Sequence, residues 1–462
     1  MPPQRRIDLS LESVRRLLRM GATPNLVNLL QKQHPADLAQ IFAELSEKER
    51  HAAFSILVER NGRLAMEAVS ELGPEKGAEL LSLRSAEDIA RLSQEIASDD
   101  AAGLIEQLAD DLRIAVLALI HPTPGGGVSE LLEYDEKTAG RLMNPHVFAL
   151  PEDVTAGEAI TALQGARDVE MVFYLYVVDE RRHLVGVVSL RRLLLVSPDT
   201  PLKRIMTTDV YSARVDLDQE EVARQVASYN LLAIPAVDAE NKLVGVITVD
   251  DIIDVIKDEA TEDVYRLAGV SVDDGVLTPP GESLRRRLPW LAVNLVTAFL
   301  AASVVGMFSA TIQQVVLLAA FMPVVAGMGG NAATQTLAVV VRGIATGELQ
   351  WSNARQALLK EGLVGLGNGL AIGAMGAVAV WVVTAMGGGG GDWVLGLILM
   401  AAMVINMFVA AVAGTIIPLG LRALKIDPAL ASSVFITTLT DLCGFLSFLG
   451  LATIFLQFLH RS

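Results

Sequence analysis

The chain has 462 residues, more than one ordinary domain holds, and its formal net charge is −16 at pH 7. The charge is uneven: 31 basic and 48 acidic residues precede Leu288, whereas six basic and five acidic residues lie from there to the end. An acidic first part argues against a nucleic-acid partner and favours cations. Cys443 is the only cysteine, which excludes an intrachain disulfide.

The first part of the chain, from about Leu11 to Ile120, predicts a bundle or superhelix of short amphipathic helices. A Pro-Gly-rich run from Pro124 to Gly127 predicts a linker after them. The helical segments are Asp37 to Leu45, Glu75 to Ser82, Ala86 to Ile96 and Gly103 to Leu108, and the turn and cap residues between them are Pro35, Ser46, Gly73-Pro74, Ser85 and Ser98 to Asp100.

An internal duplication follows this helical part. The segment Val178 to Ser189 recurs 59 residues later as Val237 to Thr248, and each copy predicts a strand, a polar turn, a second strand and a helix. A helix precedes each copy, and Met143-Asn144 and Met206-Thr207 lie at matching upstream positions. The arrangement resembles a tandem pair of CBS domains over about residues 134–257.

CBS pairs often bind adenine nucleotides, and the resemblance makes ATP a candidate ligand. The usual ribose-contacting pattern is Ser or Thr followed by Asp three residues later, and Thr248 with Asp251 satisfies it in the second copy. In the first copy Arg192 stands where the acid would be, so the nucleotide site is half supported. Tyr174 is a further candidate contact of the nucleotide.

A run of acids, from Asp250 to Asp263, then joins the duplication to the apolar part of the chain. If the run is helical, four of its acids share one face, and like charges at such spacing disfavour a helix. A hard divalent cation with oxygen ligands would relieve this repulsion, although a solvated acidic face is the plainer alternative. The seven acids are Asp250, Asp251, Asp254, Asp258, Glu259, Glu262 and Asp263.

These acids suggest a sensor. At a high concentration of such a cation, ions would bridge them to acids of a neighbouring domain and compact the soluble part; at a low concentration, repulsion would open it. The candidate partners are Asp99 and Asp100, with Asp110 and Asp111 as a weaker pair.

Five apolar stretches follow, each long enough for a helix across a bilayer, which makes the lipid bilayer a partner. Lys and Arg flank the first stretch and lie in alternate connections, and because positive loops stay in the cytoplasm, the N-terminus is expected in the cytosol and the C-terminus outside. The stretches are Pro289 to Phe308, and others within Val315 to Ile344, Leu363 to Met386, Trp393 to Leu421 and Ala429 to Leu459.

Asp441 is predicted to be the one ionisable residue deep within these spans, with no base at comparable depth. An intramembrane carboxylate without a counter-ion is costly and marks an ion path, the alternative being a protonated Asp bonded to a carbonyl. In the second span, Pro323 and Gly329-Gly330 predict a loosened helix, with Asn331 and Gln335 on one face. A packing kink is the alternative there.

These motifs together resemble the MgtE family of magnesium channels: Pro, then Gly-Gly-Asn, then Gln in the second span, and Thr-x-x-x-Asp-x-x-Gly in the last. The resemblance covers essentially the whole chain and implies a homodimer in a bacterial inner (plasma) membrane, with the pore between the two membrane halves. It implies that Asp441 and the carbonyl of Thr437 are pore ligands for Mg²⁺ and that Asn331 lines the pore.

The resemblance also assigns regulatory metal ligands and raises three departures. Asn230 stands where some members have an acid, Ser433 where some have an asparagine, and Arg192 replaces an acid near the nucleotide pocket. The acids that match the family are Asp251, Asp254, Glu259, Glu262 and Asp263. The other candidate regulatory ligands are Asp258, which shares the acidic face of the same run, and the bridging partners Asp99 and Asp100.

The expected fold is therefore a multidomain membrane protein, with an all-α cytosolic domain (1–133), an α/β tandem CBS pair (134–260), a connecting helix (261–287) and an all-α domain of five membrane helices (288–462). Alternatives are a transporter of another divalent cation (Co²⁺ or Mn²⁺), an anion or solute transporter, and a nucleotide-sensing membrane protein without transport. An enzyme is not expected, because no nucleophile–base set, zinc spacing or phosphate loop is found.

Overall fold

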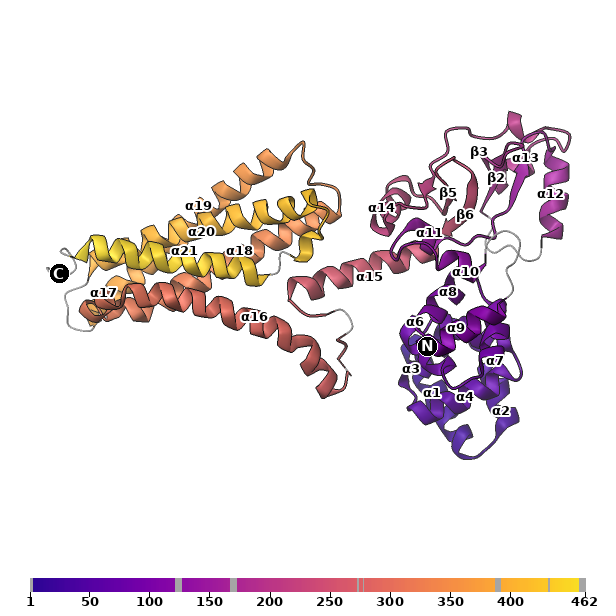
Figure 1. Ribbon diagram of the computed structural model, residues 1–462, viewed down its shortest axis with the longest axis horizontal. Coiled ribbons are helices and arrows are strands. Elements are labelled where there is room, and N and C mark those ends of the chain that lie inside the picture. Colours follow the sequence, from indigo (N-terminus) through magenta and orange to yellow (C-terminus); the bar gives the residue numbers. More distant parts are fainter. Residues whose placement is uncertain are drawn as a thin grey trace. The chain divides into compact units, whose positions relative to one another are not determined.

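The computed structural model describes residues 3–120, 127–166, 173–271, 274–276, 278–386, 392–430 and 433–456 (Figure 1). Contacts divide the chain into two compact units, Met1–Ile256 and Lys257–Ser462. The predicted linker Pro124 to Gly127 lies outside the described residues except for Gly127, which precedes a short helix.

The first unit begins with the predicted short helices. Ser46 and Glu49 form a capping box at the start of α4, and Ser85 accepts a hydrogen bond from the backbone of Asp88 at the start of α7. The helices are α1 (Pro3–Arg19), α2 (Thr23–Leu30), α3 (Pro35–Glu44), α4 (Glu47–Val58), α5 (Gly62–Ser70), α6 (Pro74–Leu81), α7 (Ala86–Leu92), η1 (Ser93–Glu95), α8 (Ser98–Glu106) and α9 (Asp110–Leu119).

One predicted boundary is wrong in this region. Ser98 to Asp100, expected as a separator, form the first turn of α8. Asp99 and Asp100 are compatible with that place because acidic side chains are stabilised at the positive end of the helix dipole. The longer α8 therefore carries the carboxylates of both Asp99 and Asp100 in its first turn.

The duplication folds as two three-stranded sheets of identical pattern, in the orders β1-β2-β3 and β4-β5-β6, which confirms the predicted tandem repeat. In each sheet the first pair of strands is parallel and the second is antiparallel. The elements are α10 (Val128–Leu131), α11 (Ala139–Leu142), β1 (Ala149–Pro151), α12 (Ala156–Gly165), β2 (Tyr174–Val178), β3 (Leu184–Ser189), α13 (Leu190–Leu195), η2 (Leu202–Arg204), β4 (Ala213–Arg214), α14 (Gln219–Tyr229), β5 (Ala233–Val237) and β6 (Leu243–Thr248).

The two repeats exchange short segments. Asn144, which precedes the first sheet, pairs with Val246 of β6 through two backbone hydrogen bonds of 2.7 and 2.9 Å. Thr207, which precedes the second sheet, pairs with Val187 of β3 in the same way, at 2.9 and 3.0 Å. The matching upstream motifs of the sequence are therefore edge segments, each added to the sheet of the other repeat.

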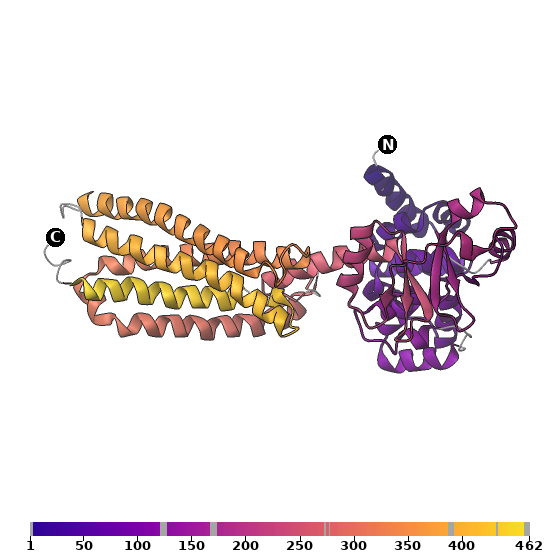
Figure 2. The same cartoon turned by 90° about the horizontal axis from the view of Figure 1, so that it is seen from above.

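Within its described residues, the second unit contains five helices long and apolar enough to cross a membrane, as predicted. They run alongside one another (Figure 2), and α20 is the most buried of them. The unit comprises the end of α15 (Val249–Leu267), α16 (Pro280–Met307), the short α17 (Ser309–Gln314), α18 (Leu317–Ala345), α19 (Ala354–Met386), α20 (Trp393–Ala423), η3 (Pro428–Leu430) and α21 (Ser433–Ile454).

Small residues bring α19 against α20. A Cβ atom at Gly365 would lie 2.7 Å from the carbonyl oxygen of Met407, and one at Gly369 would lie 2.7 Å from the Cα of Val404. Glycine therefore permits this approach, which is the packing mode expected inside a bilayer.

One expectation about the spans is wrong. α18 is a continuous helix through Pro323 and Gly329-Gly330 rather than a loosened one, although Pro323, its seventh residue, removes one hydrogen bond of the helix. Glu361 lies outside the predicted apolar stretch but within α19, which begins nine residues before that stretch, and it is 5% exposed.

Candidate ion pathway and acidic sensor

Asp441 lies near the middle of α21 and is half-buried. Within the described ranges it makes no hydrogen bond or ion pair through its side chain. Nothing in this part of the chain neutralises it, which agrees with the expectation of a lone carboxylate. A cation passing along α21 would provide the missing positive charge.

Thr437 lies one helical turn before Asp441. Its backbone carbonyl accepts a hydrogen bond of 2.8 Å from the hydroxyl of Thr440, a residue that is fully buried. A carbonyl oxygen has two lone pairs, and the carbonyl of Thr437 already accepts hydrogen bonds from the helix backbone and from Thr440. An inner-sphere contact with a cation is therefore less accessible to this oxygen than to the carboxylate of Asp441.

The second span packs against the last one at this level. A Cβ atom on Gly330 would lie 3.5 Å from the methyl group of Thr437, so α18 and α21 approach each other closely there. Asn331 is exposed in the single chain, and so is Gln335 one turn later. Exposed amides within a span are costly against lipid, so this face is suited to water or to protein.

Asn406 is a further polar residue that the sequence interpretation missed. It lies in the apolar middle of α20, is 1% exposed, and donates a hydrogen bond of 3.0 Å from Nδ2 to the carbonyl oxygen of Val325 in α18. The signal in the sequence is an amide within an otherwise apolar span.

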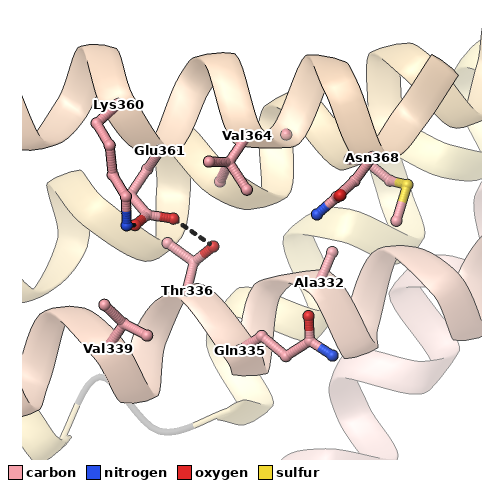
Figure 3. A pocket seen from close by; sticks show the side chains of 11 residues that line it. Ala332, Gln335, Thr336, Val339, Lys360, Glu361, Val364 and Asn368 are labelled. Carbon is pink, nitrogen blue, oxygen red and sulfur yellow. Dashed lines mark hydrogen bonds and ion pairs between the residues drawn. The ribbon is translucent and has the colours of Figure 1, made fainter. Parts of the chain in front are cut away.

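A cavity of about 190 Å³ lies between α18 and α19, with α20 behind it (Figure 3). Gln335 and Thr336 line it from α18, and Lys360, Glu361 and Asn368 from α19. The carboxylate of Glu361 forms an ion pair with Lys360 and accepts a hydrogen bond of 3.3 Å from Thr336. The predicted amide face of α18 thus has one member, Gln335, at this cavity.

The Lys360–Glu361 pair leads to a stability prediction. We expect Lys360→Met to lower the thermal unfolding midpoint in detergent more than Glu361→Gln, because the first leaves a buried charge with only Thr336, whereas the second leaves an exposed ammonium group. The expected loss is about 1–3 kcal/mol for Lys360→Met. A larger loss for Glu361→Gln would contradict the assignment of Glu361 as the buried charge.

The first unit brings together the two sets of acids that the sequence interpretation paired. Asp99 and Asp100 at the start of α8 interact electrostatically with Asp250, Asp251 and Asp254 at the start of α15. The Oδ1 atom of Asp99 is buried and has no hydrogen-bond partner within the described residues. Asp110 instead pairs with Arg113 at 2.7 Å.

Burial and mutual repulsion perturb the acids of this cluster. Burial, with Asp250 and Asp100 nearby, raises the pKa of Asp251 to about 7, although a hydrogen bond from Thr248 opposes the shift. Burial and then the charge of Asp251 raise the pKa of Asp99 well above its usual range, and burial raises that of Asp100. The cluster therefore stores repulsion that protons or cations would relieve.

Within the described residues, no group of three or more acid, His or Cys side chains is arranged closely enough to hold a metal ion. The acids of α8 and α15 thus form an electrostatic cluster rather than a preformed chelate. Carboxylates at this spacing suit a cation that keeps several of its waters, as Mg²⁺ does.

The far end of α15 has a different partner. Arg266 forms ion pairs with Glu262, one turn earlier, and with Asp427 in the connection between α20 and α21. The sequence interpretation missed Asp427, which stands beside Lys425 in a loop that was used only for its positive charge. Three further candidate acids, Asp258, Glu259 and Asp263, lie on this half of α15.

The connection from α15 to α16 is anchored by Asp274. Its carboxylate is buried and accepts hydrogen bonds from Ser283, at 2.5 Å, and from Arg287. The hydrogen bond from Arg287, and then that from Ser283, holds the pKa of Asp274 below its usual value. A movement of this connection is therefore tied to the first turns of α16.

The candidate nucleotide residues have local roles in the structure. Asp251 accepts hydrogen bonds from the hydroxyl of Thr248 at 2.7 Å and from its backbone N–H at 3.3 Å. Tyr174 begins β2 and is half-buried, and Arg192 is exposed on α13. Asp251 therefore belongs both to the candidate nucleotide site and to the acid cluster of α8 and α15.

Two departures from the family pattern can be located. Asn230 ends α14 in the left-handed conformation, with φ 50°, which asparagine tolerates better than most residues. Ser433 begins α21, and its side chain lies outside the described part.

Comparison with protein families gives three matches along the chain. Residues 33–137 match the MgtE intracellular N domain, residues 139–199 and 202–258 each match a CBS domain, and residues 322–451 match MgtE, described as a divalent cation transporter. The order of these matches is the order of the folded parts described above.

Relatives and solved structures agree with these matches. The chain is 34% identical to the magnesium transporter MgtE of Bacillus subtilis, covering 96% of each chain, and 34% identical to that of Thermus thermophilus, covering 96% of this chain and 98% of the relative. A crystal structure of the cytosolic domain of the Mg²⁺ channel MgtE in complex with ATP matches with TM-score 0.50 and 36% identity, over 53% of this chain and 99% of that one.

Proposed function

Because the chain belongs to the MgtE family of divalent cation transporters, we propose that it is a magnesium channel whose acidic cytosolic part closes it when Mg²⁺ is abundant. The observation that carries the proposal is Asp441, a half-buried carboxylate within a span, without a counter-ion among the described residues. A carboxylate without a counter-ion is costly in a bilayer, and transport of a cation past Asp441 explains why a span contains one.

The chemistry of the pathway follows from the ion. Mg²⁺ sheds water reluctantly and prefers an octahedral shell of oxygens. In a homodimer with the pore on its axis, two copies of Asp441 would hold the hydrated ion through its waters, with Thr437 and Asn331 as polar neighbours. Selection would then rest on the hydrated size and the charge of the ion together.

The gating step rests on the acids of α8 and α15. At low Mg²⁺ the repulsion among Asp99, Asp100 and Asp251 favours separation of these helix starts. Cytosolic Mg²⁺ relieves the repulsion and favours the compact arrangement. The regulatory ligands in this proposal are Asp99, Asp100, Asp251, Asp254, Asp258, Glu259, Glu262 and Asp263.

The remaining assignments are part of the same proposal. The protein lies in a bacterial inner membrane as a homodimer, with the N-terminus in the cytosol and the C-terminus outside, because Lys and Arg lie in alternate connections. It is not an enzyme. ATP binds the CBS pair at Thr248, Asp251 and Tyr174, supported by the ATP complex of a relative's cytosolic domain.

Uptake into liposomes tests the proposal. We expect purified protein in liposomes that contain a magnesium-sensitive dye to take up Mg²⁺ faster than protein-free liposomes, and uptake to fall when Mg²⁺ reaches the cytosolic side. Co²⁺ and Mn²⁺ in parallel assays address the alternative substrates. Faster uptake of Co²⁺ or Mn²⁺ than of Mg²⁺ at equal concentration would identify that ion as the substrate instead. The absence of any uptake would refute transport.

A further inference from the structure

Three membrane helices meet at Asn406. Its amide lies between Gly329 of α18 and Gly444 of α21, and it reaches the carbonyl of Val325 one turn before Gly329. A Cβ atom at Gly329 would lie 2.1 Å from Nδ2 of Asn406, and one at Gly444 would lie 2.7 Å from the same atom. The absence of side chains on the two glycines thus leaves a hollow that the amide of Asn406 enters from α20.

The amide is unusual for its surroundings. It is 1% exposed, and its Oδ1 atom has no hydrogen-bond partner in the described part of the chain. An unsatisfied acceptor in the apolar layer costs free energy, and an apolar side chain of the same size would avoid that cost. A polar residue kept at such a place calls for a role beyond filling space.

The hollow is adjacent to the candidate ion pathway. Gly444 lies one turn after Asp441 on α21, and a Cβ atom at Gly330, next to Gly329, would lie 3.5 Å from the methyl group of Thr437. The width of the hollow therefore determines how closely α18 and α21 approach at the level of Thr437 and Asp441. In the part of the chain that the structure describes, the amide of Asn406 forms no hydrogen bond with either of these residues.

We propose that Asn406 is a positioning residue: its amide, wedged between Gly329 and Gly444 and bonded to Val325, fixes the spacing of α18 and α21 and thereby the ion selectivity set at Asp441. This inference rests on the proposed function. It extends the pathway to a residue on a third helix that does not touch the ion.

The first test compares uptake of Mg²⁺ and Co²⁺ by variants in liposomes, normalised to folded protein. Asn406→Leu removes the hydrogen bond at nearly constant size, and Gly329→Ala forces the helices apart. Each is expected to change the Mg²⁺-to-Co²⁺ uptake ratio at least about threefold. Thr415→Val is the matched control, because the hydroxyl of this buried residue in α20 bonds only within its own helix, to Ala411 at 2.8 Å.

A size exchange makes the test independent of the folding of Asn406→Leu. The pair Asn406→Ala with Gly329→Ala moves one methyl group into the space that the amide vacates, and it is expected to return the uptake ratio of Gly329→Ala towards that of the parent. If Gly329→Ala leaves the ratio unchanged, or if the pair keeps the ratio of Gly329→Ala, a positioning role for Asn406 is overturned.

A geometric readout separates this inference from the proposed function. Gly330→Cys combined with Thr437→Cys, in a chain with Cys443→Ser, is expected to form a disulfide readily, because the Cβ position of Gly330 is 3.5 Å from the methyl group of Thr437. Asn406→Leu should slow that disulfide at least about threefold. An unchanged rate refutes the inference, whereas lack of ion uptake by the parent protein refutes only transport.

Discussion

Replacing Asp441 by alanine is expected to abolish Mg²⁺ uptake into liposomes, with a loss of at least about a hundredfold relative to the parent protein. The reason is electrostatic: within the described residues no other group along α21 offers a negative charge to the ion at that depth. Asp441→Asn should be nearly as impaired, because it keeps the shape and the polarity but removes the charge.

A second carboxylate of the same unit provides the control. Asp392 caps the start of α20, accepting a hydrogen bond of 3.0 Å from the backbone of Leu395, and so lies at a helix end rather than within a span. Asp392→Asn is expected to retain most of the uptake. If Asp441→Ala keeps uptake near the parent level in correctly folded protein, the ion does not pass this carboxylate and the pathway proposed above is wrong.

Neutralising the acid cluster should make the soluble part compact without magnesium. We expect trypsin to cleave the soluble part of Asp99→Asn about tenfold more slowly than that of the parent protein in the absence of divalent cations, because Asp99 no longer repels Asp251. Added millimolar Mg²⁺ should protect the parent strongly and the variant little. Asp110→Asn is the control, since Asp110 pairs with Arg113.

The same cluster predicts a pH dependence with a definite sign. The pKa of Asp251 in the folded chain is about 7, above its unfolded value of 3.8, so the folded state binds this proton more tightly. The contribution to stability is present at low pH and is lost as the pH rises from about 4 through about 7. In the absence of divalent cations, the thermal unfolding midpoint of the soluble part should therefore fall over this range, and Mg²⁺ should raise it again. A midpoint that rises with pH would contradict the repulsion.

Local patterns and long apolar runs made much of this molecule predictable. The five spans follow from length and hydropathy, and the paired sheets follow from a repeat of 59 residues. Asp99 and Asp100 were paired with the acids of α15 on charge alone, and the structure places them together. The spans and the repeat can be predicted because each depends on the residues of one segment. The acid cluster can be predicted because many like charges in one part of the chain require a cation or a proton to balance them.

The features that were missed depend on contacts between distant segments. Glu361 lies outside the predicted apolar stretch, but it falls within the longer helix α19, where it is buried and accepts a hydrogen bond from Thr336. The paired glycines of α18 predicted a loosened helix. In the structure, however, the position of Gly329 requires glycine because the side chain of Asn406, 77 residues later, occupies the space that a Cβ atom would need. A single sequence does not tell a flexible glycine from one that accommodates a neighbour.

The exchange of edge segments between the two repeats has a consequence for how this region can be divided or lost. Asn144 pairs with the sheet that contains Val246, and Thr207 pairs with the one that contains Val187, so a cut between the repeats would remove a paired segment from both sheets at once. Each repeat is therefore expected to be less stable alone than in the pair. The pair should melt as one cooperative body, and an insertion between the repeats should be tolerated only if its ends let both borders return.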